Sequence, residues 1–403
     1  MSGYNSTMSF ANGNVHFNQT WYFDLRSSVC SLSSLLPSII YLTCRFFGLS
    51  QVSSVFSAVL VLTDPTIAIE GRLILTDGIL HTFSSLALLG LANLSLSNSV
   101  FSLILCGVSL GMAFSVKYTS FGLSILVATH EYFRIFGFNL FGFLDSSDHI
   151  ENVAFFQTNI GKLIKNGVII SLSSFAVLIL AFITHVIVIK YRVSQESMIS
   201  SNYEESLLWN WEKDQSRRVI QMGLLERVFQ SIFRMHEINM NSFCPIGIES
   251  KWYEWPLILC DSLVYYAKEL RAIWMIPNPF VWYTASIGTL LLFLLIAFSI
   301  FKGDTYLIKY LFLPIGYLTS LVPFALIKRT TYLYHYIIPL ILGVINASVF
   351  LNLFLHKNIV IKNSIFVIIM FCSITEFVFL SPFTFVLPNY FMEPRLWRNN
   401  LLK

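Results

Sequence analysis

The sequence is poor in charged residues and has no clustered metal ligands. Only 12% of its 403 residues are charged, against roughly 25% in an ordinary soluble domain. The net charge of +4 is spread along the chain, which gives no reason to expect nucleic acid as a partner. The six cysteines form no C-x-x-C or His/Cys cluster, so we expect no metal. An ordinary soluble domain is excluded.

Long apolar runs take the place of the missing charge. Hydrophobic residues make up 55% of the chain, and the mean hydropathy is +0.68. The runs are close to the ~20 residues that a helix needs to cross a bilayer. The sequence therefore predicts an all-α, polytopic membrane protein of about ten transmembrane helices, near 28–47, 51–69, 79–97, 100–116, 119–135, 167–190, 281–300, 305–327, 332–355 and 360–381.

Two of these runs are irregular. Asp64-Pro65 interrupts the second, where proline removes a backbone donor that hydrocarbon cannot replace. The apolar stretch 101–130 would form a helix of about 45 Å, which is too long for one span unless it tilts strongly. We expect two short spans that meet at Lys117.

A hydrophilic insertion over 191–278 divides the chain into a six-span part, 1–190, and a four-span part, 279–403. Alternation of ten spans places the N-terminal tail, the 70–78 turn, Lys117 and the insertion on one side of the membrane. Sequons at Asn5 and Asn18 favour the lumen for that side. The short loops opposite are basic, as on a cytoplasmic face, and hold Arg134, Lys162, Lys165, Lys302, Lys357 and Lys362.

The insertion carries further features. Cys244 and Cys260 could form a disulfide if the loop is luminal, or could remain two unpaired thiols. The aromatic segments 251–256 and 274–282 are typical of amphipathic stretches at the membrane interface. A lone histidine such as His236 is more often structural than catalytic.

Basic residues on the predicted luminal side need an explanation. A cation at membrane depth costs about 2.5–3.5 kcal/mol and persists where it faces a cavity, a partner or a ligand. Arg26, Arg72, Lys117 and Arg329 are such residues. An anionic lipid headgroup would be a suitable ligand.

The turn between residues 64 and 78 has two interpretations. Asp64 and Asp77 are well placed as helix N-caps, and Arg72 could snorkel to the interface. Alternatively, Asp77 accepts a proton or orients a headgroup, and Arg72 offers its planar guanidinium to a phosphate.

Lys117 and Arg329 also have two interpretations. Lys117 follows Gly107 and Gly111, a spacing that lets two helices approach closely, and could simply snorkel. Arg329 belongs to a tract over 328–336 that is typical of a basic and aromatic interfacial belt. Contact with a phosphate is the alternative for both side chains.

Several motifs together resemble the protein O-mannosyltransferase family. They occur in the family's order and approximate spacing, and the likeness spans nearly the whole chain: EGRLILTDGIL, GVSLGMAFSVKYTS, SKWYEWPL, IPNPFVWYTAS and LVPFALIKRTTYLYHYIIP. The resemblance implies the GT-C membrane fold and an endoplasmic reticulum location. It also implies transfer of mannose from dolichyl phosphate mannose to Ser or Thr of secretory-pathway proteins, with no cofactor.

The resemblance also implies roles for single residues. Asp77 would be catalytic, and Arg72, Lys117 and Arg329 would bind the donor phosphate. Arg26 would line the acceptor side. Family members commonly pair, so a homo- or heterodimer is expected beside the lipid donor and the polypeptide acceptor.

Two departures from the family pattern leave alternatives. Residues 191–278 are too short for the β-trefoil MIR module that many members carry in this loop. The family's first helix and the loop with its Asp-Glu catalytic pair would lie before Met1. The alternatives are a non-catalytic partner subunit of the same family, another lipid-linked sugar transferase of the GT-C class, and a transporter, for which no convincing inverted repeat is found.

Overall fold

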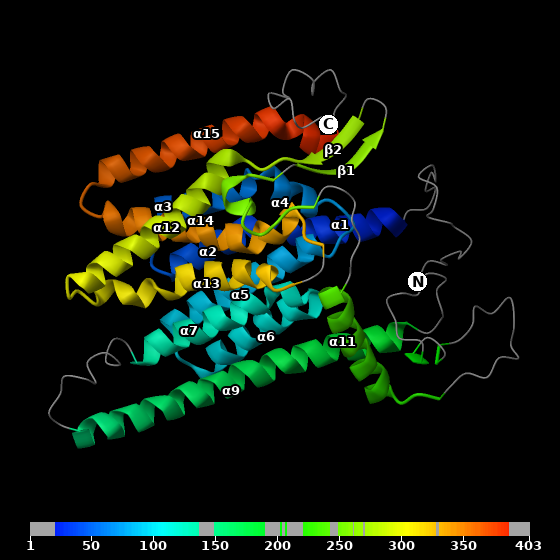
Figure 1. Ribbon diagram of the computed structural model, residues 1–403, viewed down its shortest axis with the longest axis horizontal. Helices are drawn as coiled ribbons and strands as arrows, with labels where there is room; N and C mark the ends of the chain where they lie inside the picture. Colours follow the sequence, from blue (N-terminus) through cyan, green and yellow to red (C-terminus); the bar gives the residue numbers. More distant parts are fainter. Residues whose placement is uncertain are drawn as a thin grey trace, which may run out of the picture.

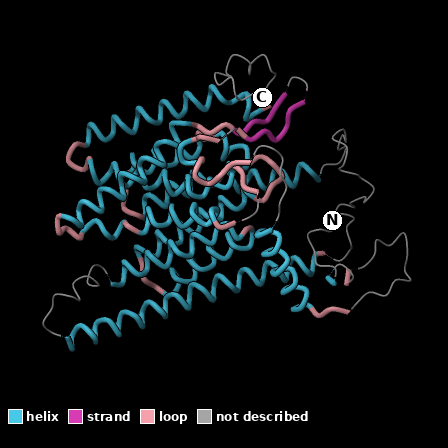
Figure 2. The backbone as a smooth tube through the Cα atoms, in the orientation of Figure 1, coloured by secondary structure: helices cyan, strands magenta, loops and turns pink. Residues whose placement is uncertain are grey.

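A computed structural model describes residues 21–136, 149–189, 202–203, 206–207, 221–241, 249–260, 262–268, 271–327 and 330–386. Its helices form an elongated bundle with one small hairpin at one end (Figures 1 and 2). The first part contains α1 (Trp21–Ser33), α2 (Leu36–Phe46), α3 (Gln51–Leu62), α4 (Pro65–Glu70), α5 (Asp77–Leu96), α6 (Val100–Val116), η1 (Tyr118–Phe121), α7 (Gly122–Phe136) and α9 (His149–Val188). The second part contains α11 (Leu224–Asn241), η2 (Trp255–Leu257), β1 (Leu263–Lys268), β2 (Arg271–Met275), α12 (Pro279–Phe301), η3 (Tyr306–Tyr310), α13 (Phe312–Leu321), η4 (Val322–Ala325), η5 (Leu333–Tyr336), α14 (Ile337–Phe354) and α15 (Ile359–Phe385).

Each of the ten expected spans coincides with a helical segment. Within the described ranges, seven segments are long and apolar enough to cross a membrane, and Gln51–Leu62 and Val100–Val116 are shorter apolar helices. The tenth, α7, has 15 residues and contains the charged residues Glu131 and Arg134. The chain is therefore a mostly helical, multi-pass membrane protein, as predicted.

The expected break at Asp64-Pro65 is present and is stabilised by buried hydrogen bonds. Asp64 is the N-cap of α4, and its carboxylate accepts bonds from the backbone N–H groups of Thr66 and Ile67 and from the Thr66 hydroxyl. The indole Nε1 of Trp282 also donates to Asp64, at 2.9 Å. Asp64 is fully buried, so these donors replace the water that hydrocarbon does not supply.

The two short helices also meet at Lys117 as expected. Helix α6 ends at Val116, Lys117 has extended backbone angles, and η1 and α7 follow. A Cβ atom added to Gly107 or Gly111 would lie 2.5 Å from a backbone oxygen of α9. The glycine spacing therefore allows α6 and α9 to pack in close contact, which confirms the predicted close approach.

The elements that the span alternation places together lie at one end of the bundle. The start of α5, the end of α6, α11 and the β-hairpin are at the right-hand end in Figure 1. The connections from α12 to η3 and from α14 to α15, with Lys302 and Lys357, are at the opposite end. The structure therefore separates the two predicted sides.

Within the insertion, the structure adds order that the sequence did not predict. Helix α11 packs beside α9, and β1 pairs antiparallel with β2 with an irregularity between Val264 and Tyr266. The prediction that 251–256 and 274–282 lie at the membrane interface is wrong for two of their four tryptophans. Trp255 and Trp282 are fully buried and pack on Tyr336, because each indole N–H finds a buried acceptor.

Replacement of Asp64 tests whether the buried cap holds the bundle. Asp64→Ala leaves buried N–H groups without an acceptor, at about 1–3 kcal/mol for each orphaned group, so we expect the free energy of unfolding to fall by about 3 kcal/mol. Thermal unfolding in detergent measures the loss. The matched control is Asp304→Ala, which removes an exposed turn bond to the Tyr306 N–H. Equal losses in the two variants would contradict this account.

Candidate functional site

An ion pair between Asp77 and Lys117 is the centre of the candidate site. The Lys117 Nζ lies 2.7 Å from both carboxylate oxygens of Asp77. The side chains are 20% and 8% exposed for Lys117 and Asp77 respectively, so the pair is largely removed from water. Two residues that the sequence analysis assigned to chemistry, 40 positions apart, are therefore in direct contact.

The backbone explains how the pair forms. Asp77 is the first residue of α5, where the positive end of the helix dipole stabilises a carboxylate. Lys117 is the C-cap of α6, where the dipole favours a cation. Asp77 is not the N-cap: that position is Thr76, which makes no side-chain cap bond. The capping interpretation is thus confirmed for Asp64 and wrong for Asp77, and Lys117 binds a carboxylate instead of snorkelling.

Three further side chains surround the pair. His81 lies one turn after Asp77 on α5 and is buried; neither of its ring nitrogens has a hydrogen-bond partner within the described ranges. The Tyr334 ring lies 5.6 Å from the Lys117 Nζ, a cation–π distance. His335 stacks on Tyr334 at 4.3 Å and is close enough to Asp77 to interact with its charge.

These neighbours were not predicted as site residues from the sequence. Tyr334 and His335 were included only in an interfacial belt, and His81 was not considered. The i,i+4 spacing of Asp77 and His81 on one helix face was an available signal. The approach of η5 to α6 was not, because no local pattern specifies it.

Arg72 and Arg26 form a separate contact. The Arg72 Nη1 donates to the carbonyl oxygen of Thr384 at 2.6 Å, and its guanidinium lies over the Phe385 ring. The Arg26 Nε donates to the Arg72 carbonyl oxygen at 3.0 Å. Burial, followed by the like charge of Arg26, lowers the pKa of Arg72 below its ordinary value, but an arginine remains protonated at neutral pH.

The predicted site residues that the structure describes thus form two pairs, Asp77 with Lys117 and Arg72 with Arg26, and the two pairs are not in contact through a hydrogen bond or ion pair. Within the part of the chain that is described, no hydrogen bond or ion pair links Arg72 to Asp77 or Lys117. Arg329 and Cys244 lie outside the described residues, so the role of Arg329 stays a prediction, and both alternatives for Cys244 and Cys260, a disulfide or two thiols, stay open. Among the described residues, no group of three or more His, Cys, Asp or Glu side chains is placed to hold a metal ion.

A second polar cluster lies on α7. Glu131 is buried and accepts two bonds from Arg134, at 2.7 and 2.5 Å, and one from the Asn166 amide at 2.9 Å. His130 Nε2 is 2.8 Å from the Ser95 hydroxyl. The carboxylate is therefore neutralised inside the protein and joins α7 to α9, as buried charges in membranes usually do.

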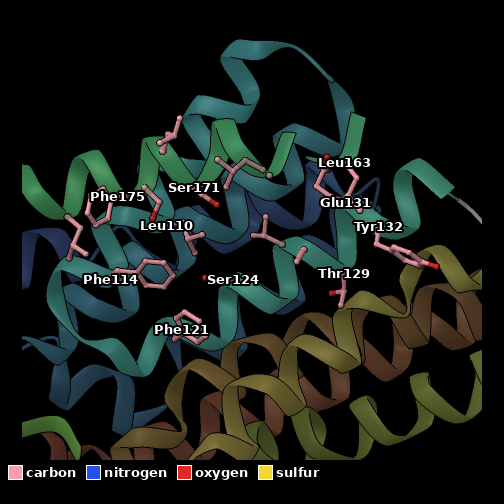
Figure 3. A pocket seen from close by; sticks show the side chains of 17 residues that line it. Leu110, Phe114, Phe121, Ser124, Thr129, Glu131, Tyr132, Leu163, Ser171 and Phe175 are labelled. Atoms are coloured by element: carbon pink, nitrogen blue, oxygen red, sulfur yellow. The ribbon is translucent and has the colours of Figure 1, made fainter. Parts of the chain in front are cut away.

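An apolar groove of about 950 Å³ lies between α6, α7 and α9 (Figure 3). One end is at Glu131 and Leu163, and the other is at Phe114 and Phe121, on either side of Lys117 in the sequence. Its walls are mainly aliphatic and aromatic, with a few serines such as Ser124 and Ser171. A groove of this character in a membrane protein suits a hydrocarbon chain.

Separating the pair by mutation tests its strength. Removing one partner of a buried ion pair strands the other charge, so Lys117→Gln and Asp77→Asn should each destabilise the protein, by about 3 kcal/mol. The double variant should lose less than the sum, because it strands no charge. Thermal unfolding in detergent measures all three, with exposed Lys302→Gln as the control. Strictly additive losses would show that the two side chains do not interact.

Comparison with known proteins places this geometry in a family. Residues 1–136 match the family model described as dolichyl-phosphate-mannose-protein mannosyltransferase. Residues 224–398 match the model of the C-terminal four-transmembrane region of protein-O-mannosyltransferase. Together the two matches cover most of the chain and include Asp77, Lys117 and η5.

Two individual relatives agree with these matches. Dolichyl-phosphate-mannose–protein mannosyltransferase 3 of Saccharomyces cerevisiae is 32% identical over 124 residues, which cover 29% of this chain and 16% of the relative. The match thus spans less than a fifth of that protein's length. A solved structure of the S. cerevisiae protein O-mannosyltransferase Pmt1-Pmt2 complex bound to the sugar donor has a TM-score of 0.77 and 14% identity. The alignment covers 93% of this chain and 80% of the other.

The structural likeness establishes the GT-C membrane glycosyltransferase fold, and the family models identify the sequence within that fold. On these findings, the chain belongs to the protein O-mannosyltransferase family.

Proposed function

We propose that this protein transfers mannose from dolichyl phosphate mannose to Ser or Thr hydroxyls of proteins that enter the endoplasmic reticulum. The observation that carries the proposal is the Asp77–Lys117 pair, which holds a cation at the end of a membrane bundle in a family of mannosyltransferases. In the reaction, the bond from mannose C1 to the phosphate oxygen breaks. A bond from C1 to the acceptor oxygen forms with inversion, and the hydroxyl proton passes to a base.

Lys117 suits the departing phosphate. An ammonium group has three N–H donors, and Asp77 offers it two oxygens, which leaves one donor for a phosphate oxygen. The side chain is still 20% exposed and can therefore be reached. In a largely dry site, a fixed cation stabilises developing negative charge more strongly than it would in water.

Asp77 fits an orienting role better than the role of proton acceptor. A carboxylate bound by an ammonium on both oxygens is a weak base, because a proton would have to compete with Lys117. Its proposed contribution is to hold Lys117 charged and correctly placed. Arg72 and Arg26 are assigned to the wall beside this centre, Arg72 toward the donor and Arg26 toward the acceptor.

The groove supports a lipid-linked donor. Its lining follows α9 from Leu163 to Leu178, a rise of about 22 Å at 1.5 Å per residue. One leaflet contributes only about 15 Å of hydrocarbon, half of a ~30 Å core. A chain that fills the groove therefore extends past the bilayer midplane, which suits a polyprenyl chain whose phosphate lies near Lys117.

A second candidate function is that of a partner subunit. The solved structure that this chain resembles is a complex of two family members. We propose that this protein also works beside a family member. It would be a non-catalytic subunit if it shows no transfer of its own but raises the activity of its partner.

Substitution of Lys117 tests the phosphate contact. We expect Lys117→Gln to lower kcat/KM for dolichyl phosphate mannose by about a hundredfold, the usual loss when one charge-stabilising donor is removed. Lys117→Arg keeps the cation but changes its shape, so it should lose less. The assay is mannosyl transfer to a Ser/Thr peptide in membranes, normalised to folded protein.

The control for this assay is Lys302→Gln, which removes an exposed lysine at the opposite end of the bundle. Wild-type rates for folded Lys117→Gln would contradict the assignment. Transfer that is absent from the wild type, but restored to a co-expressed family member by adding this chain, would select the partner-subunit function.

Blocking the groove tests the lipid path. Ser171→Trp places a large ring among the lining residues, so KM for the full-length dolichyl donor should rise about tenfold, equivalent to ~1.4 kcal/mol of binding. A short-chain donor should be unaffected. Leu180→Trp is the matched control, because Leu180 is exposed on the same helix outside the groove. Equal effects on long and short donors would place the lipid elsewhere.

A further inference from the structure

Helix α11 has a stripe of apolar residues that the described parts of the chain leave exposed. Leu225, Phe229, Phe233 and Met240 are 63, 50, 70 and 38% exposed. At 100° per residue these four positions fall within about 80° of one another around the helix. His236 falls inside the same arc, and its ring lies 6.2 Å from that of Tyr118. The charged residues follow on the neighbouring face, from Glu226 and Glu237 round to Arg234 and Arg227. The helix is therefore amphipathic, and its apolar side is not covered by any other described segment.

The buried side of α11 fixes its position. Val228 is buried in a cluster with Val186, and Ile183 and Ile232 pack against the same cluster. The Tyr118 hydroxyl donates to the Ile232 carbonyl oxygen at 3.4 Å. Helix α11 therefore crosses the end of α9 (Figure 1), and its Ile232 lies beside the residue that follows Lys117.

The surface of α9 at this level faces the membrane. Thr158–Val188 is apolar enough to span a bilayer, and Leu180, Ile187 and Val188 on it are 63, 55 and 62% exposed. Helix α11 packs on α9 between residues 179 and 189, at the end of this apolar segment. The exposed apolar residues of α11 therefore lie where the membrane-spanning part of α9 ends.

We propose that α11 is an interfacial helix that binds the surface of the phospholipid bilayer, with Leu225, Phe229 and Phe233 among the acyl chains. Its described charges cancel: Glu226 and Glu237 are balanced by Arg227 and Arg234. Arg234 is paired with Glu237 at 2.6 Å, and Arg227 donates to the Ser206 carbonyl oxygen. Binding is therefore hydrophobic and does not select anionic lipid.

The bilayer contact has a consequence for the insertion. Residues 224–241 are fixed on one side by α9 and on the other by lipid, and Ile232 lies against Tyr118, the residue after Lys117. The membrane surface thereby holds α11 beside the candidate site.

Site-specific photo-crosslinking in proteoliposomes of phosphatidylcholine tests this inference on the full chain. Benzoyl-phenylalanine in place of Phe229 or Phe233 keeps an aromatic ring and should label radioactive phosphatidylcholine several-fold more than the same group at Glu237 or Arg234. Lipid labelling that is equal at the four positions, or labelling of protein instead of lipid at Phe229 and Phe233, would overturn the proposal.

Salt and lipid charge separate hydrophobic from electrostatic binding. Labelling at Phe233 should be the same at low and high salt, and the same when part of the phosphatidylcholine is replaced by phosphatidylserine. A several-fold increase with phosphatidylserine that high salt removes would show that headgroup charge holds the helix, and would overturn the hydrophobic assignment.

Discussion

Hydrocarbon offers no hydrogen-bond partners, and this constraint governs where the chain can depart from continuous helix. The break between α3 and α4 is possible because the carboxylate of Asp64 accepts the freed N–H groups of α4 and the indole of Trp282. The break after α6 is possible because it lies at the end of the bundle, where Lys117 extends away from the helix and binds Asp77. Both interruptions have an aspartate at or next to the start of a helix. The carboxylate of Asp64 accepts hydrogen bonds only from buried groups of the fold, whereas that of Asp77 binds a partly exposed lysine. Asp64 is therefore structural, and Asp77 is placed where it can take part in chemistry.

Close packing places the site as much as the polar contacts do. Gly107 and Gly111 bring α6 against the backbone of α9, which fixes the height at which α6 ends and therefore the position of Lys117. On the other side, η5 carries Tyr334 and His335 to the pair, and the buried rings of Trp255, Trp282 and Tyr336 fill the space behind it. The Tyr336 hydroxyl bonds Ser286 on α12 and Tyr317 on α13, at 2.9 and 2.7 Å. The C-terminal helices thus hold the aromatic wall against which the N-terminal helices present their ion pair.

Much of the fold follows from the sequence because span length and proline position are local signals. The ten apolar runs, the Asp64-Pro65 break, the division at Lys117 and the glycine contact were all predicted, and each is present. The site was predicted only as a set of charges. The contact of Asp77 with Lys117 depends on how α5 and α6 are offset along their axes. The sequence of neither helix specifies this offset by itself. Trp255 and Trp282 were misplaced for a related reason: an aromatic cluster near a span end suits an interface or a buried wall equally well, and the acceptor of Trp282, Asp64, comes from a distant segment, whereas that of Trp255, Ser250, lies five residues away.

The depth of the site in the bilayer determines how strongly it can attract a phosphate. Two unit charges 4 Å apart attract by about 1 kcal/mol in water but by about 4 kcal/mol at an effective dielectric constant of 20. The Lys117 side chain is one-fifth exposed and is therefore intermediate between these two environments. The Tyr334 ring lies on one side of it, and Tyr118 is the next residue in the chain. Since Tyr118 is bound to the backbone of α11, a shift of α11 would move the residue next to Lys117 and so change how much water reaches that ammonium group. A helix that follows the bilayer surface would therefore adjust the electrostatic strength of the site without touching the substrate, because it changes the dielectric surroundings and leaves the charges in place.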